Sequence, residues 1–119
     1  MPKARAQIAG PLPTRKQVER ALAAVASRKR AKALAWFFKT GKGEYGEGDR
    51  FLGVTVPAQR KIALKHLGLP LDSIAGLLAS PIHEHRFTAL EILVAQYARA
   101  DNAGRSRICA FYLRHAERA

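Results

Sequence analysis

Apolar residues recur every three or four positions along most of the chain, which is the spacing of one buried face of a helix. Near the N-terminus, Val18, Leu22 and Val25 have this spacing. Thr14 and Gln17 precede them as a capping box, so we expect a helix to begin there. No stretch alternates apolar and polar residues between hairpin turns. The pattern therefore predicts an all-α protein.

A second helix is expected after Ser27, whose hydroxyl can cap it, with Leu34, Phe37 and Phe38 as its apolar face. Its first turn is unusual, because cations crowd the positive end of the helix dipole, where each costs a few tenths of a kcal/mol. These cations are Arg28, Lys29, Arg30 and Lys32. The cluster indicates phosphate contact, and a solvated run of charge is the simpler alternative.

Four more helices are predicted from capping residues, prolines and glycines. The third begins at Pro57 and ends at Gly68, the fourth follows Pro70, the fifth begins at Ser80-Pro81 and runs to about Arg99, and Asp101 or Asn102 caps the sixth. The faces expected to be buried include Ala58, Ile62 and Leu64, then Ile82, Ala89, Leu90, Leu93, Val94 and Tyr97, and finally Ile108, Phe111 and Tyr112. Six helices with short connectors favour an all-α, HEAT-like helical repeat, and a plain helical bundle is the alternative.

A glycine-rich segment, GKGEYGEG at 41–48, joins the second and third helices and contains the pattern G-x-G-x-x-G. A dinucleotide site needs a strand before this pattern and a helix after it, and neither is predicted here. Its acidic residues would repel a phosphate: Glu44, Glu47 and the adjacent Asp49. We therefore interpret the segment as a flexible connector, with cations at its edges: Lys39, Lys42 and Arg50.

Charge narrows the range of partners. The chain has 119 residues, enough for one domain or part of one, and a formal net charge of +12. Nearly all of this charge lies in residues 1–65, and residues 66–119 are almost neutral. Such asymmetry indicates an anionic partner, either nucleic acid or a membrane surface. We expect residues 1–13 to form a flexible basic arm, no membrane-spanning segment or signal peptide, and a cytoplasmic location.

Candidate chemistry is sparse. The single cysteine, Cys109, excludes a disulfide within the chain and a cysteine-based zinc site. His83 and His85 lie two positions apart, so on a helix they point about 200° away from one another and do not share a metal. Between them, Glu84 has Arg60 or Arg86 as possible partners. With no nucleophile–base pair, metal or cofactor site predicted, the residues favour binding over catalysis.

Three aromatic residues in a row, Trp36, Phe37 and Phe38, cannot all face a core. At least one ring is expected at the surface or against a partner. Packing against the next pair of helices is the commoner use of such a ring, and stacking on a nucleic-acid base is the other.

Three stretches resemble the DNA alkylation repair family of AlkD-type DNA glycosylases. They are AWFFKTGKGEYGEGDRFLGVTVPAQRKIA at 35–63, SPIHEHRFTALEILVAQY at 80–97 and ICAFYLRH at 108–115, and the likeness covers about residues 14–115. The resemblance implies HEAT-like repeats whose basic concave face cradles duplex DNA. It also implies excision of cationic alkylated purines, such as 3-methyladenine and 7-methylguanine, without the full base extrusion of many glycosylases.

The resemblance also implies site residues. Phe37 matches a family position where an aromatic ring lies near DNA, and Lys39, Arg60 and Lys61 are cations in matching stretches that can meet phosphate. Together with Lys42 and Arg50, these are the predicted DNA-binding residues.

The family's catalytic aspartate lies in a W-D-x-x-D-like motif after the segment resembling FYLRH, and this sequence stops at HAERA before such a motif. We therefore expect residues 14–119 to be the N-terminal part of the family domain, without a catalytic residue and weak or inactive alone. The last helix is expected to be poorly covered and available for self-association. The alternative is a non-enzymatic helical-repeat module that binds an acidic protein or RNA.

Overall fold

The computed structural model describes residues 11–38, 40, 41, 43 and 47–115. Its helices are α2 (Arg15–Ala24), α3 (Arg28–Phe37), α4 (Val56–Lys65), α5 (Leu71–Leu78), α6 (His83–Arg99) and α7 (Asn102–His115). Within those residues no strand forms, and the one β-type contact is an isolated parallel bridge between Arg50 and Ile82. The all-α prediction is confirmed, and the arrangement is compatible with a helical repeat. Most of the predicted arm at 1–13 lies outside the described residues.

Local capping signals were predicted well at three of the helices, including α7, where the Asp101 carboxylate accepts the N–H of Gly104. The Thr14–Gln17 capping box is present, and the Ser27 hydroxyl accepts the N–H of Arg30 at the start of α3. The start predicted at Ser80-Pro81 is wrong, because α6 begins at His83. The Ser80 hydroxyl instead accepts the N–H of Ile82 and shapes the turn before the helix.

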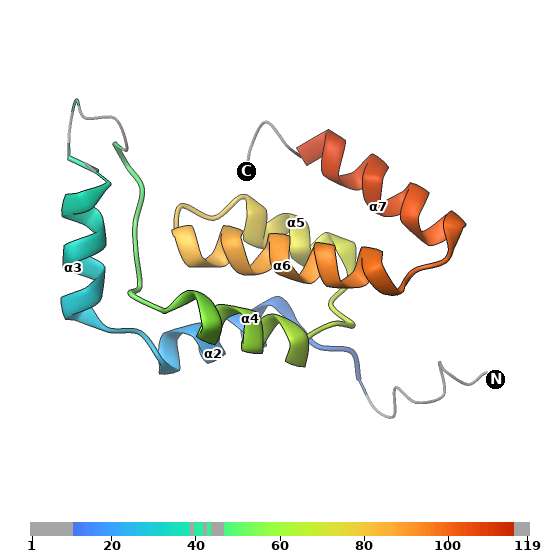
Figure 1. Cartoon of the computed structure of the whole chain (residues 1–119), viewed down its shortest axis with the longest axis horizontal. Helices are drawn as coiled ribbons and strands as arrows, with labels where there is room; N and C mark the ends of the chain where they lie inside the picture. The colour runs from blue at the N-terminus through green and yellow to red at the C-terminus, as the bar shows by residue number, and fades with distance from the viewer. Residues whose placement is uncertain (1–10, 39, 42, 44–46, 116–119) are drawn as a thin grey trace.

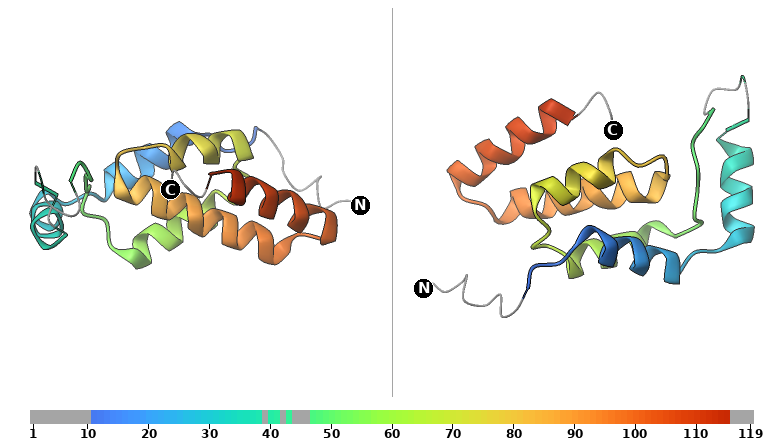
Figure 2. Two further views of the ribbon diagram at one scale, coloured as in Figure 1. Left: turned by 90° about the horizontal axis from the view of Figure 1, so that it is seen from above. Right: turned by 180° about the vertical axis from the view of Figure 1, so that it is seen from behind.

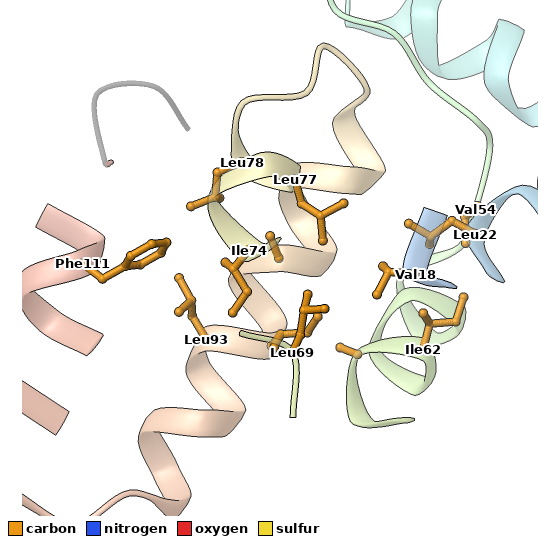
Figure 3. Packing of buried hydrophobic residues seen from close by; sticks show 13 residues of the cluster. Val18, Leu22, Val54, Ile62, Leu69, Ile74, Leu77, Leu78, Leu93 and Phe111 are labelled. Atoms are coloured by element: carbon orange, nitrogen blue, oxygen red, sulfur yellow. The ribbon is translucent and has the colours of Figure 1, made fainter. Parts of the chain in front are cut away.

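Four helices enclose the core. In Figure 1, α6 runs through the middle of the molecule with α5 behind it and α4 below, and α2 lies behind α4. The view from behind in Figure 2 shows the same pairing, with α2 and α5 now in front. Side chains from all four helices meet between them (Figure 3), and each fully buried Leu or Ile contributes about 1.5–3 kcal/mol. The labelled members are Val18, Leu22, Val54, Ile62, Leu69, Ile74, Leu77, Leu78, Leu93 and Phe111.

Helix α7 covers only part of this core. Phe111 is buried and Ile108 is half-buried, but Tyr112 is exposed, contrary to the predicted inward face. On α6, Val94 and Tyr97 are also exposed, and so is Leu64 on α4. No described residue covers these exposed side chains of α6 and α7. An open apolar groove of about 550 Å³ therefore lies between the two helices. Its lining is Leu90, Leu93, Val94, Tyr97, Ile108, Cys109, Tyr112 and Leu113. Self-association at α7 stays a prediction.

Helix α3 stands apart from the other helices. Figures 1 and 2 show it at one end of the molecule, running across the direction of α4 and α6. None of its residues is buried, so the predicted apolar face of Leu34, Phe37 and Phe38 does not face the core. A helix of ten residues is too short to be stable alone in water, so contacts outside the core must hold it in place.

Candidate nucleic-acid interface

The base of α3 is held by the segment that leads into α4. The N–H of Ser27 donates to the carbonyl of Leu52 at 2.9 Å, and the Arg30 guanidinium donates to the carbonyl of Gly53 at 2.7 Å. These contacts fix the position of the helix through backbone atoms. One of the four cations in the first turn therefore has a structural partner.

Gly53 is required at this contact. Its φ is +83°, a conformation that L side chains rarely adopt, and a Cβ built there would lie 2.1 Å from the carbonyl oxygen of Ser27. Only a residue without a Cβ lets the two backbones come this close. The glycine thus sets where α3 leaves the body of the protein.

Glu84 holds the same segment from the other side. It is 1% exposed, and its carboxylate oxygens accept the N–H groups of Leu52 at 2.9 Å, Gly53 at 2.9 Å and Val54 at 3.3 Å. Hydrogen bonds of this kind stabilise a buried carboxylate without a cation. Glu84 bonds to neither of the partners considered for it, Arg60 and Arg86.

Asp49 ties the end of the glycine-rich segment to α6. Its carboxylate lies 2.7 Å from the Arg86 guanidinium and 3.4 Å from Nδ1 of His83. The backbone of Arg50 continues the attachment, since its N–H donates to the Pro81 carbonyl and its own carbonyl accepts the N–H of His83 at 2.7 Å. Both oxygens of the Asp49 carboxylate therefore have partners on α6.

An aromatic cluster connects the upper end of α3 to α6. The Phe38 ring stacks on Phe51 with centroids 5.6 Å apart, and Phe51 lies 4.9 Å from the ring of His83. Phe37 meets Phe38 edge-on at 5.1 Å. Phe38 is therefore the ring of the triplet that anchors the helix, while Phe37 is 68% exposed and Trp36 is 83% exposed.

The predicted DNA-binding residues occupy two elements and the segment between them. Phe37 is on α3, Arg50 precedes α4, and Arg60 and Lys61 are on α4, all with exposed side chains. Lys39 and Lys42 lie outside the described residues. Helix α3 makes no extensive contact with α4. The structure thus does not gather the four described residues into a pocket.

Arg60 has a partner, Glu91, whose Oε2 lies 3.4 Å from the Arg60 Nε. The Arg60 side chain is 61% exposed, and a pair of this kind contributes about 0–1 kcal/mol. Exchange of Glu91 for a phosphate would therefore cost little, and Arg60 remains able to contact an anion.

Three cations of α3 were not among the predicted site residues. Arg28, Lys29 and Lys32 are exposed, and none of them forms an ion pair within the described part of the chain. The sequence already indicated phosphate contact for this cluster, but the predicted DNA-binding residues did not include it. Lys29, Lys32 and Trp36 follow the i, i+3, i+7 spacing of one helix face.

The glycine-rich segment is partly described. Gly43 and Gly48 have φ values of +79° and +87°. The Glu47 carboxylate accepts the N–H of Gly43 at 3.1 Å, which is an amide that a phosphate loop would need for its ligand. This contact supports the interpretation as a connector, while Glu44 and Gly46 lie outside the described residues.

His85 is the residue next to Glu84 and is buried under the turn before α6. Its Nδ1 forms a hydrogen bond of 2.9 Å with the Ser80 hydroxyl. Burial lowers the pKa of His85 below its ordinary value, although the nearby carboxylates of Glu19 and Glu84 act in the opposite direction. We interpret His85 as a neutral, buried side chain that packs under this turn.

No three His, Cys, Asp or Glu side chains in the described residues are grouped so as to hold a metal ion. None of the helices in that same part of the chain has the length and apolar character needed to cross a bilayer.

The family model described as DNA alkylation repair enzyme matches residues 18–119. No curated protein and no solved structure matches the chain. The matched range begins within α2 and extends past α7, so it includes α3, the Gly53 contact and the buried Glu84. This match supports a general role in DNA alkylation repair, and the chain belongs to the DNA alkylation repair enzyme family.

Proposed function

We propose that this chain binds duplex DNA during alkylation repair, and that α3 is its main point of contact. The observation that carries the proposal is a helix with no buried residue whose first turn is filled with exposed cations. Such an arrangement opposes the helix dipole and adds no core packing, and a bound polyanion would offset the repulsion among the cations.

The predicted residues have different roles in this proposal. The exposed side chains of Arg28, Lys29 and Lys32 contact phosphates, together with Arg50 from the segment before α4. Arg60 and Lys61 extend the contact along α4, and Lys39 and Lys42 contribute from the glycine-rich segment. Phe37 supplies an exposed ring beside the backbone.

Excision needs a carboxylate that stabilises the positive charge developing on the sugar. In the described residues, every carboxylate that is buried or half-buried already has a structural partner, including that of Glu19, which pairs with Arg15. Glu84 accepts backbone N–H groups, Asp49 pairs with Arg86, and Glu91 pairs with Arg60. We therefore propose that α2–α7 supply recognition of DNA and not the catalytic carboxylate.

The test compares charge reversals at opposite ends of the molecule. Affinity for a labelled duplex of about 20 base pairs is measured by fluorescence anisotropy between about 50 and 200 mM salt, the range over which phosphate contacts weaken. Lys29→Glu/Lys32→Glu is expected to lower affinity at least about 10-fold and to reduce the slope of log affinity against log salt by about 2.

The matched control is Arg107→Glu/Arg114→Glu on α7, because it changes the net charge equally and both side chains are exposed. Equal losses in the two variants, or a flat salt response, would contradict the α3 interface.

Tighter binding of a double-stranded RNA, or of an acidic protein alone, would favour the non-enzymatic module. In the same preparation, release of 3-methyladenine from methylated DNA above the spontaneous rate would refute the absence of a catalytic carboxylate.

A further inference from the structure

We infer that Trp36 stacks on an unstacked base of the bound DNA, which gives this chain a preference for duplexes with an unpaired base. The inference rests on the proposed function and goes beyond it, because phosphate contacts alone do not distinguish one duplex from another.

The exposure of Trp36 is the first observation. It is the most exposed of the large hydrophobic side chains in the described residues, at 83%. Tryptophan is highly buried on average, so an almost fully exposed indole on a well-formed helix is unusual. Neither the core nor the aromatic cluster at Phe38, Phe51 and His83 includes this ring.

The direction of the ring is the second observation. Successive helix residues are about 100° apart, so Trp36 points about 200° away from Phe38. Because Phe38 faces the cluster that ties α3 to α6, Trp36 faces away from the body of the protein. The anchoring ring and the outward ring are therefore on opposite sides of one rigid helix.

The cations beside Trp36 are the third observation, and they identify the partner. Lys29 and Lys32 precede Trp36 on the same face, over about 10.5 Å of helix axis, which is close to three nucleotide steps of one DNA strand. An indole next to exposed ammonium groups fits a ligand that has both flat aromatic faces and negative charge. Nucleic acid has both in every nucleotide, whereas an acidic protein surface has aromatic faces only where Phe, Tyr or Trp happens to lie beside its charges.

A fully paired duplex hides its base faces within the stack. An indole gains a base partner only where a base is unpaired or displaced, and such a partner is worth about 5- to 150-fold in affinity. The class of ligand that this helix favours is therefore duplex DNA with a local defect in stacking.

Trp36 is the only tryptophan of the chain, so intrinsic fluorescence reports on this one ring. The whole chain is titrated with a fully paired duplex, with the same duplex carrying one unpaired adenine, and with heparin, which has negative charge but no bases. We expect strong quenching and tighter binding with the unpaired adenine, weak quenching with the paired duplex, and binding without quenching for heparin.

The variant Trp36→Leu is then compared with the unchanged chain by anisotropy on both duplexes. It is expected to fold, since the ring is exposed, and to bind the paired duplex normally while losing the preference for the unpaired adenine. Equal quenching by heparin, or a preference for the unpaired adenine that Trp36→Leu retains, would overturn the inference. So would Trp36 emission that changes when the chain is diluted without DNA, because the ring would then be covered by another copy of the chain. In each of those cases salt-dependent binding to the paired duplex would still support the proposed function. Failure to bind any duplex at low salt would refute both.

Discussion

Helices α3 and α6 contact each other through Phe38 and His83, yet the polar residues of their first turns differ in burial. The first turns of both are rich in polar side chains, RKRAK in α3 and HEHR in α6. In α6 these residues turn inward, so that Glu84 and His85 are buried and bonded to neighbouring segments. In α3 they remain at the surface with the aromatic rings that follow. Polar residues that are buried organise the fold, and polar residues that are left exposed against the dipole indicate a ligand.

Helix α6 also positions α3. Glu84 holds the three N–H groups of the segment that in turn contacts Ser27 and Arg30. His83 and Asp49 attach the other end through Phe51 and Arg86. The exposed helix α3 is thus oriented by a buried part of a neighbouring helix, which leaves the charged face of α3 at the surface.

Substitution of Glu84 should have the largest effect on stability. Glu84→Ala leaves the N–H groups of Leu52, Gly53 and Val54 buried without an acceptor, so we expect the free energy of unfolding to fall by about 3–5 kcal/mol. Urea denaturation followed by circular dichroism measures it. Glu91→Ala, which removes an exposed pair with Arg60, is the control and should cost less than about 1 kcal/mol. Similar losses in both variants would mean that the Glu84 carboxylate does not organise the junction.

A methyl group at Gly53 should have the next largest effect. Gly53→Ala places a Cβ against the Ser27 carbonyl at a positive φ, so we expect a loss of about 2–4 kcal/mol or displacement of α3. Gly43→Ala is a close match, because Gly43 has φ +79° but nothing within 4 Å, and strain alone should cost about 1–2 kcal/mol. Thermal unfolding gives the two values. If they are equal, the close approach of the backbones is not what fixes α3.

Local signals predicted much of the fold, and contacts between distant residues account for what the sequence missed. Thr14, Ser27 and Asp101 were recognised as caps because a cap bonds within its own turn. The role of Glu84 could not be read from the sequence, since its partners are backbone amides about 30 residues away and any residue type carries them.

The apolar spacing of α3 misled the prediction for a related reason. Leu34, Phe37 and Phe38 have the period of a buried face, but a period shows only that residues share a side of a helix. Whether another element covers that side depends on where the helix is attached. Here the Gly53 contact directs α3 away from the core, so the same pattern becomes a surface.

The smallest effect on stability is expected on the exposed side of α3. Phe37→Ala removes a ring that is 68% exposed and meets Phe38 edge-on, so we expect the free energy of unfolding to change by about 0.5–1 kcal/mol. The equivalent truncation in α6, Ile92→Ala, should cost about 2–5 kcal/mol because Ile92 is fully buried. On DNA the order is reversed, since Phe37→Ala should weaken duplex binding several-fold, and Ile92→Ala, measured where it remains folded, should leave it unchanged. A variant of Phe37 that loses stability like Ile92 while keeping its affinity for DNA would show that α3 belongs to the packed body of the protein.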